Sequence, residues 1–315
     1  MPIELHQLRY FVAVAEERHF TRAAARFHVA QPSVSAQIQA LERSLGAELF
    51  HRDRRGVALT EAGAELLPIA RQILAGVEEA GLRLQGLDGL SRGHLAVGAT
   101  PSLATTLLPA ALGAFHHRHP GVALTVVEEG SHLLVERLAS GLLDLGLVIL
   151  PLRHAALDTT ALVTEELVVV VGPRHRLAAR ASAGRRMRLA ELADEPIVMF
   201  REGYDLRAVT LEAIRSAGFA PRVAVEGGEM ASVLAFVARG LGAALVPSIV
   251  ASGDRRLRTL RLADPGLRRT IGLARRSDRA PSRANTALVT TIQEMLSAEG
   301  WPGPRPIGLK VLRGR

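Results

Sequence analysis

Cysteine is absent from this sequence of 315 residues, which excludes disulfides, thiolate metal sites, cysteine nucleophiles and cysteine-based redox sensing. No uninterrupted apolar run reaches the roughly 18 residues that a membrane span requires. Residues 1–9 also lack the order of positive charge and then an apolar stretch that is typical of a signal peptide. We therefore expect a cytoplasmic protein without a membrane partner.

The motifs of several enzyme classes are missing as well. The sequence contains no P-loop, no zinc-binding motif and no paired-carboxylate constellation. The Gly-Leu-Gly segment at 240–242 is half of a dinucleotide-binding fingerprint, but Leu245 stands where the third glycine is needed. The three histidines within residues 116–119 end an amphipathic helix, where polar side chains ordinarily meet solvent. We expect no catalytic site, no metal and no cofactor.

The formal charge of +8 is unevenly distributed along the chain. Residues 254–315 hold 14 basic and 5 acidic residues, whereas residues 1–92 hold 11 of each. Net charge therefore does not indicate where a nucleic acid would bind. Local clustering is more informative, because seven arginines lie between Arg18 and Arg55 against three acidic residues. This cluster can form the basic face that phosphate binding requires.

Residues 1–59 have the pattern of three helices followed by a hairpin. Residues 5–17 place apolar side chains on one helical face, and Thr21 is expected to cap a second, short helix. Pro32 suits the first turn of a third helix, which ends at Gly46. The segment LFHRDRRGVALT has charged residues between two apolar stretches, which predicts a hairpin, or wing. The apolar face of the third helix consists of Val34, Ile38, Leu41 and Leu45.

A long helix is expected over residues 60–87, beginning at Thr60, with residues 88–93 as a hinge. Its apolar positions alternate steps of four and three residues, which is the heptad spacing of a coiled-coil seam. The seam predicts pairing with a second copy of the chain; packing of the helix on its own domain is the alternative. The seam consists of Leu66, Ala70, Ile73, Val77, Ala80, Leu84 and Leu87.

From residue 94 the pattern changes to alternating strands and helices, which is typical of sheets that are mainly parallel and covered by helices. Two similar series predict two lobes, one formed by residues 94–164 with 268–298 and the other by residues 165–267. Ligands bind such folds in the crevice at the carboxyl ends of the strands. The basic residues 299–315 are rich in proline and are expected to be disordered. Helices are expected at 102–118, 131–138, 206–217, 229–239 and 284–295.

These features together resemble one protein family. The segment LHQLRYFVAVAEERHFTRAAARFHVAQPSVSAQIQALERSLGAELFHRDRRGVALTEAG is similar, nearly position by position, to the DNA-binding domain of LysR-type transcriptional regulators. TPSLATTLLPAALGAFHHRHPGVAL and ARGLGAALVP are similar to parts of that family's effector domain, so the resemblance covers residues 3–298. It implies an α/β protein overall, with an all-α winged helix-turn-helix, a long linker helix and two Rossmann-like lobes of the periplasmic-binding-protein type.

The resemblance also implies a function. It points to a sequence-specific DNA-binding regulator that is switched by a small-molecule effector, such as an organic acid, bound between the lobes. The implied partners are double-stranded promoter DNA, RNA polymerase and further copies of the chain, as dimers that assemble into a homotetramer at the nucleoid. A solute receptor with the same two-lobed fold is an alternative, against which residues 3–59 count. A third hypothesis is that the protein is an enzyme.

In a helix-turn-helix the second helix of the pair enters the major groove with its N-terminal residues toward the base edges. Glutamine bonds adenine in a bidentate way, serine reaches bases or phosphates, and apolar side chains contact thymine methyls. A solvated surface without DNA contact is the alternative for these residues. Phosphate contacts are expected from Thr21, Arg22 and the wing residues Arg52, Arg54 and Arg55. The expected base-reading group is Gln31, Pro32, Ser33, Val34, Ser35 and Gln37.

Two positions depart from the family pattern. Ala30 stands where relatives usually have serine or threonine, so the third helix lacks its cap, a loss of about 1 kcal/mol. Ala36 stands where many relatives have arginine or another long polar residue, which puts one expected DNA contact in doubt.

The effector site is expected at strand-to-helix junctions that face the crevice. Thr100, Pro101 and Ser102 offer backbone N–H groups and a hydroxyl at a helix N-terminus, which suits a carboxylate. Ser131 begins another helix, and Ile149 closes a strand with an apolar side chain where some relatives have a charged one. Plain helix capping by the serines and a solvated arginine are the alternatives. The second lobe is expected to contribute Phe200, Arg201 and Gly228.

Overall fold

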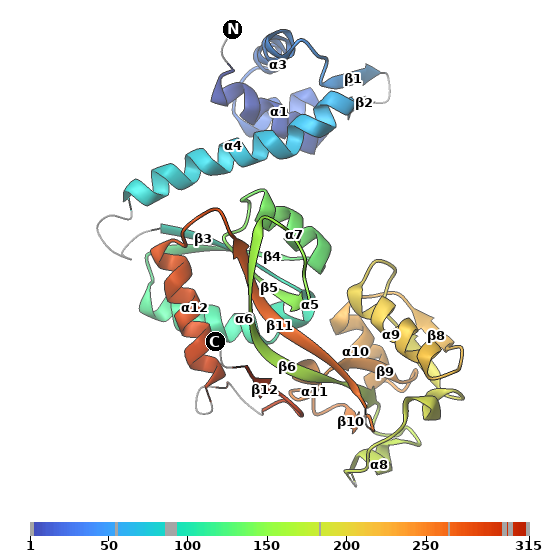
Figure 1. Ribbon diagram of the computed structural model, residues 1–315. Helices are drawn as coiled ribbons and strands as arrows, with labels where there is room; N and C mark the ends of the chain where they lie inside the picture. The colour runs from blue at the N-terminus through green and yellow to red at the C-terminus, as the bar shows by residue number, and fades with distance from the viewer. Residues whose placement is uncertain are drawn as a thin grey trace. The chain divides into compact units, whose positions relative to one another are not determined.

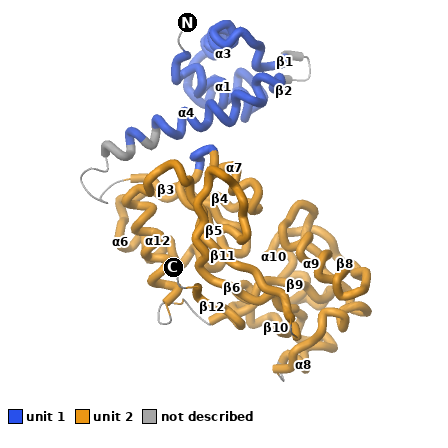
Figure 2. The backbone as a smooth tube through the Cα atoms, viewed as in Figure 1, with its two compact units in different colours: residues 1–89, 140–142 blue, residues 90–139, 143–315 orange. Residues whose placement is uncertain are grey.

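The computed structural model describes residues 3–53, 56–85, 93–182, 184–263, 265–297, 301 and 305–312. The chain divides into two compact units (Figure 2). Unit 1 is residues 1–89 with 140–142, and unit 2 is residues 90–139 with 143–315. None of the described helices combines the length and the apolar character needed to cross a membrane.

Unit 1 contains three helices, a hairpin and a long fourth helix (Figure 1). The hairpin pairs Phe50 with Leu59 in antiparallel register, which confirms the prediction from LFHRDRRGVALT. The prediction of Thr60 as a helix cap is also confirmed, because its hydroxyl accepts a hydrogen bond from the Gly63 N–H at 3.0 Å. The elements are α1 (Leu5–Glu17), α2 (Phe20–Arg26), α3 (Gln31–Leu45), β1 (Phe50–Asp53), β2 (Gly56–Leu59) and α4 (Glu61–Gln85).

The predicted cap of α2 is wrong. Thr21 is the second residue of the helix, and the N-cap is His19, whose Nδ1 accepts from the Thr21 N–H at 3.2 Å. At α3 the sequence expectation is confirmed, since Ala30 provides no side-chain cap. The helix ends at Gly46 with a φ of 69°, a left-handed conformation that favours glycine.

The predicted seam on α4 divides into two parts. Leu66 and Ala70 pack against the core of unit 1, as the alternative of a helix on its own domain requires. Ile73 and Val77 remain 42% and 40% exposed. The predicted position Leu87 and the side chain of Leu84 lie outside the described residues, as do residues 88–92 of the hinge. The exposed part of the seam is thus confined, among described residues, to the second half of the helix.

Unit 2 alternates strands and helices. The first series is β3 (Gly93–Ala99), α5 (Pro101–Ala104), α6 (Leu107–Arg118), β4 (Val122–Glu128), α7 (Ser131–Ala139), β5 (Leu145–Leu150) and β6 (Leu157–Val171). The second is α8 (Ala178–Ser182), η2 (Leu189–Leu192), β7 (Pro196–Met199), α9 (Asp205–Ser216), β8 (Arg222–Glu226), α10 (Met230–Ala238), β9 (Ala244–Pro247), α11 (Ser248–Ala251) and β10 (Arg258–Arg261). The chain returns through β11 (Leu267–Arg276), α12 (Arg283–Leu296) and β12 (Lys310–Val311).

Parallel pairing joins β3 to both β4 and β5, and β7 to β8. We call the part around β3, β4 and β5 lobe 1, and the part around β7, β8 and β9 lobe 2. Strands β6 and β11 form one long antiparallel pair that runs through both lobes (Figure 1). The expectation of mainly parallel sheets therefore holds only away from this pair, since strand periodicity does not reveal which partner a strand will meet.

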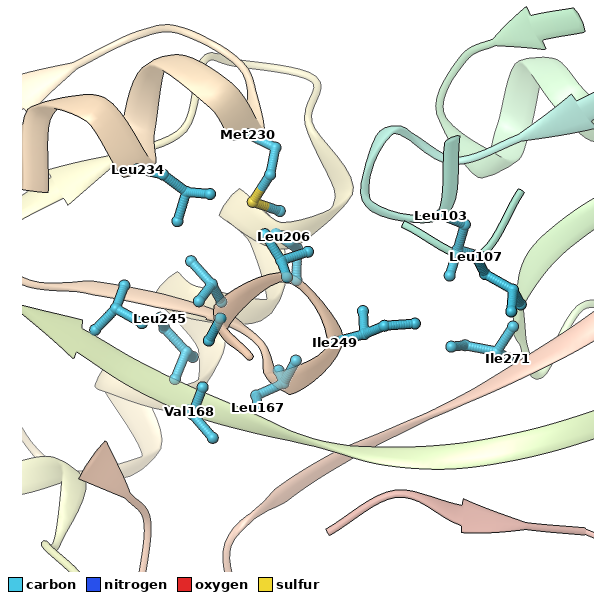
Figure 3. Packing of buried hydrophobic residues seen from close by; sticks show 14 of the residues in the cluster. Leu103, Leu107, Leu167, Val168, Leu206, Met230, Leu234, Leu245, Ile249 and Ile271 are labelled. Atoms are coloured by element: carbon cyan, nitrogen blue, oxygen red, sulfur yellow. The ribbon is translucent and has the colours of Figure 1, made fainter. Parts of the chain in front are cut away.

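One hydrophobic cluster extends through both lobes. Leu103 and Leu107 approach Ile271 in lobe 1, while Leu245 and Leu234 lie in lobe 2 (Figure 3). Because the crossing strands contribute to this cluster, the strand ends that face the space between the lobes are held by a shared core.

Two expectations for unit 2 are wrong. The helix predicted at 102–118 is divided into α5 and α6, because the hydroxyls of Thr105 and Thr106 bond back to carbonyls of the first turn. The tail 299–315 was expected to be disordered, yet residues 305–312 pack on unit 2, where β12 pairs with β6. Leu309 is buried in the main cluster and Trp301 packs against it, so apolar residues between the prolines and arginines hold this segment.

Candidate DNA interface and ligand cavity

The N-terminal part of α3 presents polar side chains at the surface of unit 1. Pro32 and Ser33 are exposed, and Gln31 and Ser35 are half-buried. Helix α3 begins at Gln31 without a side-chain cap; Pro32 has no backbone N–H, and the Ser33 N–H donates to the Ala30 carbonyl at 3.0 Å. This short surface combines donors and acceptors of the kind that contact base edges and phosphates.

Two of the predicted base-reading residues are engaged elsewhere. Val34 is fully buried in the core of unit 1, so the predicted contact with a thymine methyl is contradicted. Helical spacing already places Val34 with Ile38, and the core uses both. The Gln37 amide oxygen accepts from Gln7 Nε2 at 3.2 Å and lies 2.9 Å from His6 Nε2. Gln37 is therefore held against α1.

The predicted phosphate contacts lie at the edges of this surface. Thr21 and Arg22 are exposed. Arg22 donates to the carbonyl oxygen of Glu17, and its Nε lies 3.6 Å from Glu17 Oε2. In the wing, Arg54, Arg55 and the side chain of Arg52 lie outside the described residues.

Glu16 connects α1 to two other helices of unit 1. Its Oε2 accepts from Arg26 Nη1 at 2.8 Å, and its Oε1 accepts from Arg71 Nη2 at 3.0 Å. Partial burial alone would raise the pKa of Glu16, but the hydrogen bonds and positive charges of the two arginines hold it below its usual range. The pair Glu16–Arg71 thus ties α4 to α1.

Unit 2 contains a cavity of about 310 Å³ between its two lobes. Lobe 1 lines it with the turns that follow β3 and β4, and lobe 2 lines it with the segment that enters α9 and with the start of α10. Strand β11 adds Arg268 and Arg269. The volume and the mixture of apolar and polar lining are typical of a small-molecule site. The apolar part includes Leu133, Ile149, Leu167, Leu206 and Val209.

Two of the lining residues, Ser102 and Arg269, belong to a buried charge network. Arg269 Nη2 donates to the Ser102 hydroxyl at 2.9 Å, and its Nε donates to Glu165 Oε1 at 2.8 Å. Glu165 is fully buried, and its Oε2 accepts from the Ile249 N–H at 2.9 Å. Ser102 therefore connects α5 to β11. Its predicted free hydroxyl is already engaged.

Two hydroxyls that line the cavity have no hydrogen-bond partner among the described residues. They belong to Thr100, which is 4% exposed, and to Tyr204, which is 7% exposed. Burial raises the pKa of Tyr204, and the Glu229 carboxylate raises it further. The Tyr204 ring stacks on Phe200 with centroids 4.7 Å apart. Buried polar groups are ordinarily satisfied, so these two hydroxyls point to a ligand.

Four carboxylates also line the cavity, and three of them have partners. Both Glu129 oxygens accept from Arg137, at 2.7 and 2.8 Å. Asp205 Oδ2 accepts from the Ser131 hydroxyl at 2.8 Å, which joins lobe 1 to lobe 2. Glu229 Oε1 accepts from Arg201 Nη2 at 3.0 Å. The fourth carboxylate is Glu128, the last residue of β4.

The structure brings five of the predicted effector residues to the cavity. They are Thr100, Pro101, Ser102, Ile149 and Arg201. The three others do not line it: Ser131 is bonded to Asp205, Phe200 is buried beneath Tyr204, and the Gly228 carbonyl accepts from the Arg201 N–H at 3.1 Å.

The sequence prediction missed Arg269, Tyr204 and Glu128. Tyr204 follows Phe200 and Arg201 closely in the sequence, so the prediction identified the right loop but not this residue. Arg269 and Glu128 lie in strand segments and have no local feature that distinguishes them from other charged strand residues. Only the register of those strands brings them to the cavity.

Comparisons with known proteins agree with the division of the chain into unit 1 and unit 2. Residues 5–64 match the sequence model described as "Bacterial regulatory helix-turn-helix protein, lysR family", and residues 88–297 match "LysR substrate binding domain". The chain is 38% identical over 251 residues to YnfL of Escherichia coli K12, an uncharacterised HTH-type transcriptional regulator, covering 79% of this chain and 83% of that protein.

Solved structures are similar over nearly the whole chain. A full-length variant of OxyR from Pseudomonas aeruginosa has a TM-score of 0.72 at 28% identity, with 93% of this chain and 95% of that chain covered. Full-length CbnR in complex with its target DNA has a TM-score of 0.70 at 27% identity, with 92% and 99% covered. Each of these two solved proteins therefore matches this chain across both of its units.

Proposed function

This chain belongs to the LysR family of transcriptional regulators, and we propose that a small molecule bound in the cavity of unit 2 switches its binding to promoter DNA. At the family level the chain is a DNA-binding regulator with an effector-binding domain, and not an enzyme. Residues 89–93 match the spacing G-x-S-x-G, but a nucleophile elbow joins a strand to a following helix, whereas this segment leads into β3.

The cavity carries the proposal. The Thr100 and Tyr204 hydroxyls supply two unsatisfied polar groups, and the guanidinium of Arg269, which is bonded to Glu165 and Ser102, also lines the cavity. Grouped donors of this kind suit a carboxylate, because charge-assisted hydrogen bonds to an ionised acceptor are about twice as strong as neutral ones. An organic acid is therefore the effector class that these groups favour.

DNA reading is proposed for the N-terminal part of α3. Gln31, Pro32, Ser33 and Ser35 are the candidates that remain after Val34 is assigned to the core and Gln37 to contacts with α1. Thr21, Arg22 and the wing arginines would contact phosphates. The similarity to CbnR, which was solved with its target DNA, supports this assignment.

Assembly is proposed through α4. The exposed side chains of Ile69, Ile73 and Val77 give this helix an apolar stripe that a second copy of the chain can cover. Assembly of dimers into a tetramer, contact with RNA polymerase and a cytoplasmic location belong to the same proposal, which the family resemblance supports. Effector binding would change the closure of the two lobes and thereby shift the population of DNA-binding states.

The test uses the full-length protein and a promoter fragment selected by its own binding. Small organic acids are screened by thermal shift, and DNA affinity is measured by fluorescence anisotropy with and without each acid that raises Tm. The readout is the ratio of the two affinities. Thr100→Val is expected to reduce the effector's apparent affinity about ten-fold, because it removes one hydrogen bond to an ionised group.

The matched control is Thr290→Val, which makes the same change at an exposed position of α12. An acid response equal in Thr100→Val and in the wild type would count against the cavity as the effector site.

A further inference from the structure

Glu128 and Glu229 line the cavity from different lobes, and their carboxylates are near enough to interact. Glu128 ends β4 in lobe 1, and Glu229 is the N-cap residue of α10 in lobe 2. Glu229 receives both of its hydrogen bonds from Arg201 on Oε1, at 3.0 and 3.1 Å. Among the described residues, Glu128 has no cationic partner within ion-pair distance.

The two carboxylates affect each other. Burial raises the pKa of Glu128, and the negative charge of Glu229 raises it further. Like charges that meet in a partly desolvated site oppose the approach of the groups that carry them. A positive charge placed between Glu128 and Glu229 would reverse this interaction and would favour closure of the lobes.

The unsatisfied hydroxyls of Thr100 and Tyr204 line the same cavity as these two carboxylates. In the parallel register of β3 and β4, Ala99 pairs with Glu128, and Thr100 is the next residue of the chain after Ala99. Neighbouring strands are about 4.8 Å apart. The ionisation of Tyr204 responds to Glu229, Arg269, Glu128 and Asp205, so its side chain lies among charges of both signs. A positive and a negative group of one ligand must therefore be only a few atoms apart.

We infer that the effector is an amino acid, or a similar zwitterion, whose ammonium group lies between Glu128 and Glu229 and whose carboxylate meets Thr100, Tyr204 and Arg269. This rests on the proposed function, which places the effector in the cavity. The apolar wall of Leu133, Leu206 and Val209 receives an apolar side chain. An acid without the amine would leave the repulsion between the two carboxylates in place.

The test compares three matched series of compounds on the full-length protein by isothermal titration calorimetry. The amino acids are L-leucine, L-methionine and L-phenylalanine; each is compared with its 2-oxo acid and with the amine left by decarboxylation. At least one amino acid is expected to bind about ten-fold or more tightly than both of its analogues, because each analogue lacks one charge-assisted interaction.

Variants then locate the ammonium group. Glu128→Gln is expected to remove the preference for the amino acid over its 2-oxo acid, whereas Thr100→Val weakens both compounds. Glu136→Gln is the matched control, because Glu136 is an exposed residue of α7 that does not line the cavity. A fall in the affinity ratio only in Glu128→Gln supports the inference.

Three results would overturn it: 2-oxo acids that bind as tightly as the amino acids, a ratio unchanged in Glu128→Gln, or no binding of any amino acid in the three series. If 2-oxo acids bind in a manner that depends on Thr100, the cavity remains the effector site and only the amine is wrong. If neither class of acid binds, the result counts against both the inference and an acid effector.

Discussion

Helix α4 of unit 1 exposes Ile69, Ile73 and Val77, whereas unit 2 buries the side chains of Glu165 and Arg269. Soluble domains ordinarily do the opposite, with apolar side chains inside and charged ones outside. In unit 1 the exposed apolar stripe lacks a covering element among the described residues, which indicates a partner chain. In unit 2 the buried charges satisfy each other, and they hold the lining of a cavity in place. The exposed apolar side chains of unit 1 are thus expected to be covered by a second chain, whereas the buried charges of unit 2 are neutralised within the same chain.

The largest effect is expected at the proposed dimer interface of α4. Ile73→Asp combined with Val77→Asp places charges in the proposed dimer seam. Four apolar side chains per dimer are lost from the interface, at roughly 1.5 kcal/mol each. We expect the dimer to dissociate at micromolar concentration, which sedimentation velocity measures. Gln72→Asp adds the same charge at an exposed polar position of α4 and serves as the control. An unchanged mass in the double variant would contradict the seam.

The next largest effect concerns the buried ion pair of unit 2. Arg269→Ala leaves the fully buried Glu165 without its cationic partner, and breaking a buried pair in this way costs about 3–5 kcal/mol. Chemical denaturation of the full-length protein measures the loss in the transition of unit 2. Arg222→Ala removes an exposed arginine of β8 and is the control. Replacement of both Arg269 and Glu165 by methionine is expected to restore most of the stability; failure to do so would show that the pair matters for more than charge balance.

A smaller effect is expected from packing at two glycines of α4 in unit 1. A Cβ at Gly63 would lie 2.2 Å from the Leu49 carbonyl oxygen, which is backbone and cannot move freely. Gly63→Ala is therefore expected to destabilise unit 1 by about 1–3 kcal/mol. Gly81→Ala lies in the same helix, meets nothing within 4 Å and is expected to stabilise it slightly. Hydrogen exchange in α1 and α4 distinguishes the two variants. Equal exchange in both would contradict the close approach.

The smallest effect depends on pH. The pKa of Glu16 is lowered in the folded protein, so its pairing with Arg26 and Arg71 stabilises unit 1 above the usual glutamate pKa of about 4.3. The contribution is lost as the pH falls through the lowered pKa of the folded state. Because the side chain is 36% exposed, we expect only a few tenths of a kcal/mol. Hydrogen exchange in α1 of Glu16→Gln should differ from that of the wild type at pH 7 and converge with it at pH 3. A difference that persists at pH 3 would rule out the ion pairs as its cause.

The helices of unit 1 could be predicted because their signals are local. Periodic apolar residues, Thr60 before a helix and Gly46 after one are features within a few residues of the structure that they specify. Val34 was assigned both to the apolar face and to DNA contact, and burial decided between the two uses. The same limit applies to Leu66 and Ala70, whose heptad spacing is compatible with a partner chain and with their own domain.

The cavity was predictable only in part. Thr100, Pro101 and Ser102 were found because a strand followed by a helix start is a local pattern with a known use. Tyr204 was missed because its neighbours in the sequence offered stronger candidates. Glu128 was missed because an acidic residue at the end of a strand is ordinary until the opposite lobe places Glu229 near it.

By itself, the sequence determined the helices of unit 1, the wing, the cap at Thr60 and the family. Each of these depends on residue types at short, regular spacing. The tertiary structure alone decided which apolar residues of α4 remain exposed, that residues 305–312 pack on unit 2, and which charges meet in the cavity. The bond from Arg269 to Ser102 joins residues 167 positions apart, so it depends on strand register and chain crossing rather than on any local pattern.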